Sequence, residues 1–520
     1  MAVLLAAAVG VVAYRVISNH NDKSPVAGGV GSERTVTIPT DGAQLSAQVM
    51  TPAHPAGRSP LIVMPASWGQ PATEYHAIAT GFASAGYVVV AYAQRGFPAS
   101  TGSVDFGGPA TQHDVKTVVD WALAHTAADP ARIGLFGISY GAGISLLAAA
   151  QDPRIKAVAA LSTWADEAAT YDLNGTPSTG ALSTLIGSAK SKASFGPTVQ
   201  HLQQVLRNDP KALGPAVRAI SADRSPADQV AALNRNHPAI MIANAYQDSI
   251  FPPSQLVHFF DELTTPKRMQ LAAGDHGGPE LSALYGRDNE TVDDARAWFD
   301  HYLRGESNGI QSEGPIILHD VRTGALRTYQ TWPVAKKDDA YPLGRPGTAA
   351  SADPSPTWQS TITAGEDGGA GSGKPQYLSL NDYQPPKITV HDVKAGAAFV
   401  WDGPALTSPL VVAGTPQVNL MLASTSPTTT LYAYLYDVDP QGSGQLLSTA
   451  PYTVTGLKAN AGKAVTIPLE PMAWTVPSGD HVALVIDTVD DRYTSLTKKG
   501  AKVTAGSDSH HPATLTVPTA

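Results

Sequence analysis

Short apolar runs recur along the first 300 residues, separated by stretches with helical spacing. Two alternating segments, 35–39 and 44–50, flank the turn Asp41-Gly42, which predicts a β-hairpin. The runs that follow are apolar at every position, as is typical of parallel strands covered by helices on both faces. They occupy residues 61–64, 88–92, 133–136, 157–161, 239–243 and 269–272. Helical patterns occupy residues 74–84, 113–125, 142–151, 254–263 and 292–303. This alternation predicts an open, doubly wound α/β sheet.

Two features divide the rest of the chain. Residues 163–237 are too long for a simple crossover and contain helical stretches, so we expect a helical cap over the strand ends. After Gly305 helical periodicity fades, and short alternating segments separated by turn residues predict an all-β sandwich. Within it, the Gly/Ala/Ser/Pro-rich stretch from Gly347 to Gly373 is interpreted as a long loop. The alternating segments are 398–401, 417–423, 431–437, 445–455, 464–469 and 481–487.

The expected organisation therefore has five parts. They are an N-terminal segment (1–33), a first part of the α/β domain (34–162), the cap (163–237), a second part (238–305) and the β-sandwich (306–520).

Composition narrows the classes of function. The net charge is −9 and no Lys/Arg cluster runs along the chain, so a nucleic-acid partner is not expected. The absence of cysteine excludes disulfides, a thiolate nucleophile and Cys-ligated zinc. No sequence feature calls for a metal or an organic cofactor, and the oligomeric state stays open.

The N-terminus begins with an apolar run, residues 2–14. Thirteen residues are too few to span a bilayer but match the apolar core of an export signal. We expect an exported or envelope-anchored protein, with membrane association through this run and a polar linker over 18–33. The alternative is a disordered start on a cytoplasmic protein.

The segment Gly137-Ile-Ser-Tyr-Gly141 has the G-x-S-x-G pattern of a nucleophile elbow. An apolar strand is predicted before it and a helix rich in small residues after it, which is the context this motif requires. The glycines permit the sharp strand-to-helix turn. The turn would present the Ser139 hydroxyl at the helix N-terminus, where backbone amides favour developing negative charge.

A serine hydroxyl needs a base to act as a nucleophile, and in this arrangement an acid and then a histidine follow it along the chain. Asp248 comes just after the run 239–243, and His276 lies on a glycine-flanked loop after the run 269–272. We expect both beside Ser139. Asp275 is a rival for the acid role, but adjacent loop residues rarely aim at each other's rings.

An oxyanion needs two donors. The backbone N–H of Tyr140, the residue after the nucleophile, is the first candidate. The second is expected in the loop Pro65-Ala-Ser-Trp-Gly-Gln70, from Trp68 or a backbone amide beside it. Trp68 could instead only line the pocket.

Residues 34–518 resemble the cocaine-esterase-like and Xaa-Pro dipeptidyl-peptidase group of serine hydrolases. The resemblance rests on the elbow, on Asp41-Gly-Ala-Gln-Leu-Ser-Ala, on Asp120-Trp121, on Pro404-Ala-Leu-Thr-Ser-Pro and on Ser509-His-His-Pro. It implies an α/β-hydrolase fold with a helical cap and a C-terminal jelly roll. Two positions depart from the group: Trp68 replaces a tyrosine that often completes the oxyanion hole, and Gln94 replaces an acid.

Three hypotheses about function follow. The first is an esterase or amidase that works through an acyl-enzyme, with Ser139 as nucleophile, His276 as base and Asp248 as the orienting acid. The second is a dipeptidyl peptidase, which needs a carboxylate for the substrate's free amino group. Asp166 and Glu167 could supply it, although helix capping is the preferred interpretation of this pair. The third is a non-catalytic exported binding protein.

Overall fold

The computed structural model describes residues 29–55, 57–347, 357–376, 383–459 and 461–519. The predicted N-terminal apolar run and most of its linker lie outside these residues. The first described strand begins at Val30, a few residues before the predicted start of the α/β domain. In the described part of the chain, no helix is long and apolar enough to cross a membrane.

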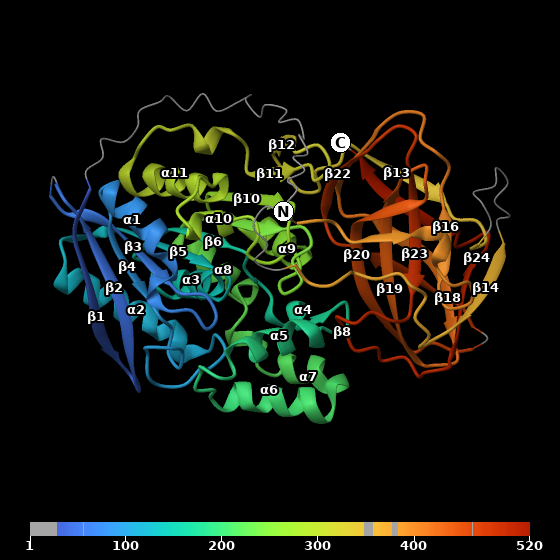
Figure 1. Ribbon diagram of the computed structural model, residues 1–520, viewed down its shortest axis with the longest axis horizontal. Coiled ribbons are helices and arrows are strands. Elements are labelled where there is room, and N and C mark those ends of the chain that lie inside the picture. The colour runs from blue at the N-terminus through green and yellow to red at the C-terminus, as the bar shows by residue number, and fades with distance from the viewer. Residues whose placement is uncertain (1–28, 56, 348–356, 377–382, 460, 520) are drawn as a thin grey trace, which may run out of the picture.

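A ten-stranded sheet organises the N-terminal half (Figure 1). Its order is β1-β2-β4-β3-β5-β6-β9-β10-β11-β12, parallel from β4 to β11 with antiparallel partners at both edges. All six predicted apolar runs are strands of this sheet, and the predicted hairpin forms β1 and β2. The bounds are β1 Val30–Thr40, β2 Ala43–Pro52, β3 Ser59–Pro65, β4 Val88–Tyr92, β5 Ala128–Ile138, β6 Ile155–Leu161, β9 Ala239–Ala245, β10 Lys267–Ala272, β11 Ile316–His319 and β12 Leu326–Tyr329.

Helices cover both faces of the sheet because the central strands are apolar on both. Alternate residues of β3, such as Ile62 and Val63, belong to two different buried clusters on the two faces. One cluster includes α1 (His76–Ser84) and α11 (Glu290–Arg304). The other includes α2 (Pro109–His125), α3 (Tyr140–Gln151) and α9 (Ser254–Glu262). This is the predicted doubly wound arrangement of an α/β-hydrolase.

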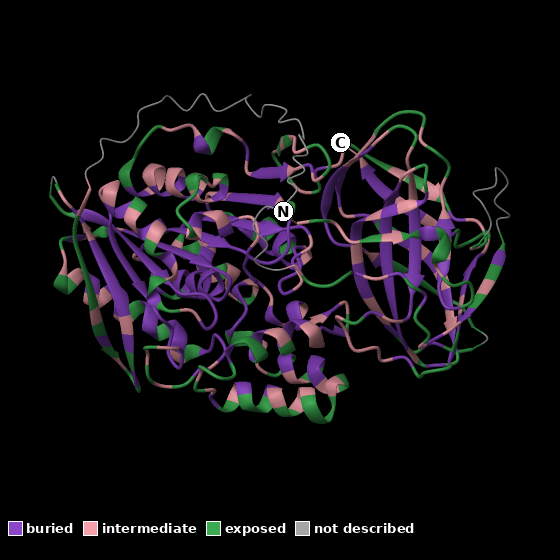
Figure 2. Cartoon of the chain, in the orientation of Figure 1, coloured by how far each residue is buried: buried purple, intermediate pink, exposed green. Residues whose placement is uncertain are grey.

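A helical cap occupies the gap between β6 and β9, as predicted. Figure 1 shows α5, α6 and α7 along the lower edge of the molecule, with α6 outermost, and α8 beside α3. The outer face of α6 is exposed and its inner face is buried (Figure 2). The helices are α4 Glu167–Tyr171, α5 Thr179–Ala189, α6 Pro197–Asn208, α7 Leu213–Arg218 and α8 Val230–Asn236, and the short strands β7 (Asp172–Leu173) and β8 (Thr176–Pro177) form a small hairpin among them.

Two antiparallel sheets form the C-terminal β-sandwich, which we call the β domain (β13–β25). One sheet contains β13, β14, β17, β18, β21, β22, β24 and β25, and the other contains β15, β16, β19, β20 and β23. Their facing side chains form a common buried core. The bounds are β13 Lys337–Pro342, β14 Trp358–Thr363, β15 Lys387–Thr389, β16 Phe399–Asp402, β17 Leu410–Gly414, β18 Gln417–Ser424, β19 Thr428–Val438, β20 Ser443–Thr455, β21 Lys463–Pro468, β22 Met472–Val476, β23 His481–Asp487, β24 Lys502–Ser507 and β25 Thr514–Thr519.

Two details differ from the sequence-based expectations. The first sheet continues past Gly305, because β11 pairs with β10 in parallel and β12 pairs with β11. The stretch 347–373 is not a single loop, since β14 lies within it and pairs with β24. Trp358 and Ile362 of β14 enter the sandwich core, so two apolar anchors outweigh the loop-like composition around them.

The β domain packs directly on the rest of the molecule. Thr453 N–H donates to Asn174 O at 3.0 Å and Gly180 N–H to Arg492 O at 2.8 Å, which joins the β domain to the cap. Ala413 and Ala473 of the β domain belong to the same buried cluster as the sheet of the N-terminal half.

We predict that a fragment ending at residue 330 will be poorly soluble. It keeps all ten strands of the first sheet but exposes the apolar surface that Ala413 and Ala473 cover, and such surface promotes aggregation. Soluble yield and size-exclusion profile, compared with the full chain, measure the effect. A soluble, monomeric fragment as heat-stable as the full chain would show that the two parts are independent.

Candidate active site

The nucleophile elbow forms as predicted between β5 and α3. Ser139 has φ 56° and ψ −122°, a left-handed backbone conformation that is costly for a residue with a side chain. Its N–H donates to Leu161 O of the neighbouring strand at 2.8 Å. A Cβ at Gly137 would collide with the backbone of Gly141, and one at Gly141 with the carbonyl of Pro65, so both positions require glycine.

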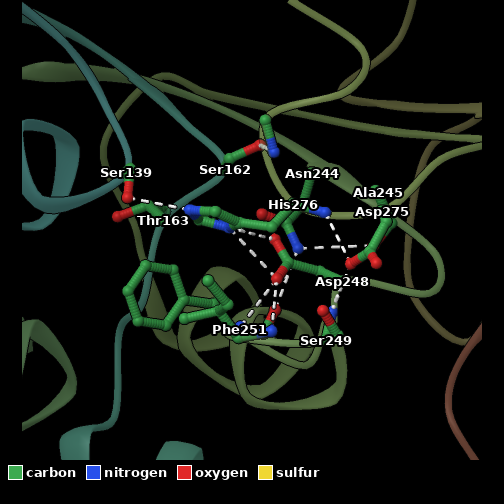
Figure 3. A network of polar contacts seen from close by, with 12 residues as sticks. Ser139, Ser162, Thr163, Asn244, Ala245, Asp248, Ser249, Phe251, Asp275 and His276 are labelled. Carbon is green, nitrogen blue, oxygen red and sulfur yellow. Dashed lines mark hydrogen bonds and ion pairs between the residues drawn. The ribbon is translucent and has the colours of Figure 1, made fainter. Parts of the chain in front are cut away.

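The structure brings Ser139, His276 and Asp248 together in one chain of hydrogen bonds (Figure 3). His276 Nε2 lies 2.8 Å from Ser139 Oγ. His276 Nδ1 lies 2.9 Å from Asp248 Oδ2 and 3.1 Å from Oδ1. The serine is on the elbow, the acid follows β9 and the histidine follows β10. All three residues are buried, with 5–6% of their surface exposed.

Local contacts fix the acid. Asp248 Oδ1 accepts the backbone N–H groups of Ile250 at 2.9 Å and Phe251 at 2.7 Å. Phe251 also packs edge-on against the His276 ring. The carboxylate is thereby held in place to orient the imidazole.

The pKa of His276 depends on its contact with Asp248. Burial alone would lower the pKa of His276, but the charge of Asp248 and its hydrogen bond to Nδ1 outweigh burial and raise the pKa above the usual value. The raised pKa means that the imidazole accepts a proton more readily than a free histidine does.

Asp275 does not take the acid role. Its Oδ1 accepts the backbone N–H of Ser249 and that of His276, each at 2.7 Å, and no hydrogen bond joins its carboxylate to the imidazole of His276 in the described structure. Asp275 therefore holds the loops and leaves the ring to Asp248.

The structure contradicts the prediction that the Trp68 indole could donate to the oxyanion. Its indole N–H donates to Leu185 O of helix α5 at 2.7 Å, which removes it from the oxyanion hole. The side-chain donor hypothesis is therefore wrong. The backbone N–H groups of Trp68 and Tyr140 form no hydrogen bonds among the described residues, so they remain the candidate donors.

A buried network, which the sequence did not suggest, ties the Trp68 loop to the elbow. Ser67 Oγ donates to Ile138 O at 3.0 Å, and Ile138 N–H donates to Tyr75 OH at 2.9 Å. Ser67 N–H donates to Glu74 Oε2 at 2.8 Å. Burial raises the pKa of Glu74 to about 7. The two candidate donor loops are thus fixed to one another through the residue that precedes Ser139.

The pocket at Ser139 is small and mostly aromatic. Besides Ser139, it is lined by Trp68, Phe106, Tyr140, Trp164, Glu167, Tyr171, Leu185 and Phe251. The cap supplies Tyr171 and Leu185, so it forms part of the pocket wall.

The two acids after β6 have separate roles. Asp166 caps helix α4 by accepting the N–H of Ala169 at 2.9 Å, as the preferred interpretation predicts. Glu167 instead lines the pocket, and its carboxylate accepts no hydrogen bond from the described residues. Burial raises the pKa of Glu167 to about 8, although the nearby Arg224 acts in the opposite direction.

Comparison with known proteins decides the family. A model of the X-Pro dipeptidyl-peptidase (S15) family matches residues 41–278, and a model of the C-terminal non-catalytic domain of X-Pro dipeptidyl-peptidases matches residues 308–516. Together the two models, which describe the two parts of X-Pro dipeptidyl-peptidases, match most of the chain. The resemblance inferred from the elbow and the β domain is therefore confirmed.

Individual relatives bear different names. A putative serine esterase from Mycobacterium tuberculosis is 24% identical over 53% of this chain and 46% of its own length. The chain spans less than half the length of the curated relatives it matches.

Two solved structures share the whole fold. A CocE/NonD family hydrolase from Staphylococcus aureus has a TM-score of 0.70 and 15% identity, covering 97% of this chain and 98% of the other. An α-amino acid ester hydrolase has a TM-score of 0.72 and 15% identity, covering 96% and 98%.

We predict that Trp68→Phe will leave kcat within about tenfold of wild type, because a backbone donor survives the change. Losing the hydrogen bond to Leu185 should lower the free energy of unfolding by roughly 1 kcal/mol and shift KM through movement of α5. Steady-state kinetics and thermal denaturation measure these effects. A fall in kcat of about 10²-fold or more with constant KM would return the indole to the oxyanion hole.

Proposed function

We propose that the chain cleaves an ester or amide bond through an acyl-enzyme, with Ser139 as nucleophile, His276 as general base and Asp248 as the orienting acid. The observation that carries this proposal is the unbroken hydrogen-bond chain from Ser139 Oγ through His276 to Asp248. The match to the S15 family model supports it.

The geometry gives each group one role. Ser139 Oγ attacks the carbonyl carbon while His276 Nε2 takes the hydroxyl proton, and Asp248 stabilises the imidazolium. The carbonyl oxygen becomes an oxyanion that the N–H groups of Tyr140 and Trp68 would receive. His276 then gives its proton to the leaving group, which departs. In the second half of the reaction, His276 takes a proton from water, which attacks the carbonyl carbon of the acyl-enzyme. The bond to Ser139 Oγ then breaks, His276 returns the proton to Ser139, and the acid is released.

The pocket favours a small acyl group. The space beside Ser139 is narrow, and aromatic rings form most of its wall. We therefore favour ester cleavage over dipeptide release. The names of the mycobacterial esterase and of the α-amino acid ester hydrolase agree with this choice.

We predict that Ser139→Ala and His276→Ala will each lower kcat by about 10³-fold or more, because the three groups act as a unit. Asp248→Asn should lower kcat by about 10⁴-fold, since it favours the wrong imidazole tautomer. Asp248→Asn also removes the charge that raises the pKa of His276, so residual activity should extend to lower pH. Hydrolysis of p-nitrophenyl esters across pH measures all three. Wild-type turnover by Ser139→Ala would refute the nucleophile assignment.

Glu167 favours a second candidate, a substrate whose acyl part carries an amino group. A buried carboxylate without a hydrogen bond, in the same pocket as Ser139, would pair with an ammonium group. An amino-acid ester or the N-terminal dipeptide of a peptide has such a group near the scissile carbonyl. Binding it would stabilise the charged form of Glu167 and lower its raised pKa.

We predict that Glu167→Gln will separate the two candidates. If the substrate is amino-bearing, kcat/KM should fall by about 10–100-fold, the size of a lost charge-assisted hydrogen bond. Amino-acyl p-nitrophenyl esters and Xaa-Pro p-nitroanilides test this loss, and p-nitrophenyl acetate, which lacks an amino group, is the control substrate. Equal effects on all three would reject a role in amine recognition.

A further inference from the structure

The acid and the histidine of the triad stand on two separate loops, and one buried carboxylate joins them. Asp275 is 2% exposed. Its Oδ1 accepts the N–H of Ser249, the residue after the acid, and the N–H of His276 itself, each at 2.7 Å (Figure 3). The two loops therefore share one acceptor, and the distance between them is fixed by that carboxylate.

The other oxygen of Asp275 reaches the β domain. Asp275 Oδ2 accepts the backbone N–H of Gln376. The Gln376 side chain is held in turn, because its Nε2 donates to Gln384 O at 2.6 Å and its Oε1 accepts the N–H of Gln384 at 3.2 Å. A segment about 100 residues downstream of the triad histidine thus contributes a fixed donor beside it.

The β domain also holds both ends of the loop that carries Asp248. At one end, Gln247 Nε2 donates to Leu446 O at 3.0 Å. At the other end, the N–H and the hydroxyl of Ser254 each donate to a different oxygen of Glu470 at 2.8 Å. The loop is therefore anchored at its start and its end by the same domain that anchors Asp275.

We propose that Asp275 is a positioning residue for the triad and that the β domain aligns Asp248 and His276 through the Gln376–Asp275 hydrogen bond. Asp275 touches no reacting atom. It acts on the backbone of the two loops, so the β domain, which contributes none of the three triad residues, becomes part of the catalytic apparatus. This inference rests on the proposed hydrolase function.

The charge of Asp275 provides a second way to test its positioning role, through the pKa of His276. Three acids act on the His276 imidazole and favour its charged form: Asp248 from the β9 loop, and Glu280 and Asp275 from its own loop. Burial raises the pKa of Glu280 itself to about 7. Removing the Asp275 charge while Asp248 and Glu280 stay should lower the pKa of His276.

The test uses a matched pair at one position in the full chain. Gln376→Pro deletes the backbone N–H that Asp275 accepts, whereas Gln376→Ala keeps that N–H and loses only the side chain. With p-nitrophenyl acetate, we expect Gln376→Pro to lower kcat by on the order of 10–10²-fold, with KM changed by less than about threefold, because misplaced catalytic groups cost rate. Gln376→Ala keeps the N–H but loses the two side-chain bonds to Gln384, so we expect it to lower kcat by less than Gln376→Pro does.

Asp275→Asn provides an independent arm. In this variant the side-chain oxygen can still accept the Ser249 and His276 N–H groups. The side-chain –NH₂ then faces the Gln376 N–H, and because both groups are donors, that hydrogen bond is lost. We expect a lower kcat and a shift of the acidic limb of the kcat/KM–pH profile to lower pH, which a purely structural role would not produce. If Gln376→Pro does not fold, as judged by thermal denaturation, this arm decides.

The outcomes separate the two claims. A folded Gln376→Pro that matches Gln376→Ala in kcat, or an Asp275→Asn variant with wild-type kcat and pH profile, would overturn the positioning role and leave the hydrolase intact. A wild-type protein that hydrolyses neither esters nor anilides would overturn the hydrolase proposal itself.

Discussion

The site depends on how closely three pieces of backbone approach one another at the elbow. Strand β5, helix α3 and the loop after β3 meet with no room for a Cβ at Gly137 or Gly141. At this contact Ser139 adopts its left-handed conformation. Its neighbour Tyr140 lies beside Trp68, with ring centroids 5.2 Å apart. The cost of such a backbone, of order 1–3 kcal/mol, is offset by the packing of the sheet and helix around it.

The acid and the histidine of the site come from segments far from Ser139 in the sequence. Asp248 and His276 stand on loops at the ends of β9 and β10, and loops are less constrained than strands. Here the constraint comes from two buried acids, Asp275 between the loops and Glu470 at the start of α9. Both acids connect the loops to the β domain, which packs closely on the rest of the molecule.

The cap determines what can reach Ser139. Helix α5 is fixed to the floor of the pocket by the Trp68–Leu185 hydrogen bond, and Tyr171 of α4 adds another aromatic wall. This narrow pocket with one buried carboxylate, Glu167, leaves little choice for the acyl group. Selectivity should therefore come from the cap and from Glu167, and chemical reactivity from the elbow and its two partner loops.

The fold and the site could be predicted from the sequence where the signal lies in adjacent residues. The all-apolar run 133–136 followed by G-x-S-x-G predicts both strand and elbow, because period and turn chemistry lie in adjacent residues. The order of acid and histidine along the chain placed Asp248 and His276 correctly relative to Ser139. It could not show that the Trp68 indole bonds to Leu185, more than 100 residues away, or that Gln376 reaches Asp275, because such contacts depend on the packed domains. Strand β14 was missed because its anchors, Trp358 and Ile362, lie within a loop-like composition.

The central claim is that Ser139 is an activated nucleophile, and covalent labelling tests it most directly. The full chain would be treated with a fluorophosphonate, digested, and the adduct located by mass spectrometry. The account predicts one adduct on the peptide that contains Ser139, and none in Ser139→Ala. A folded wild-type protein that stays unlabelled, or an adduct on a different serine, would contradict it.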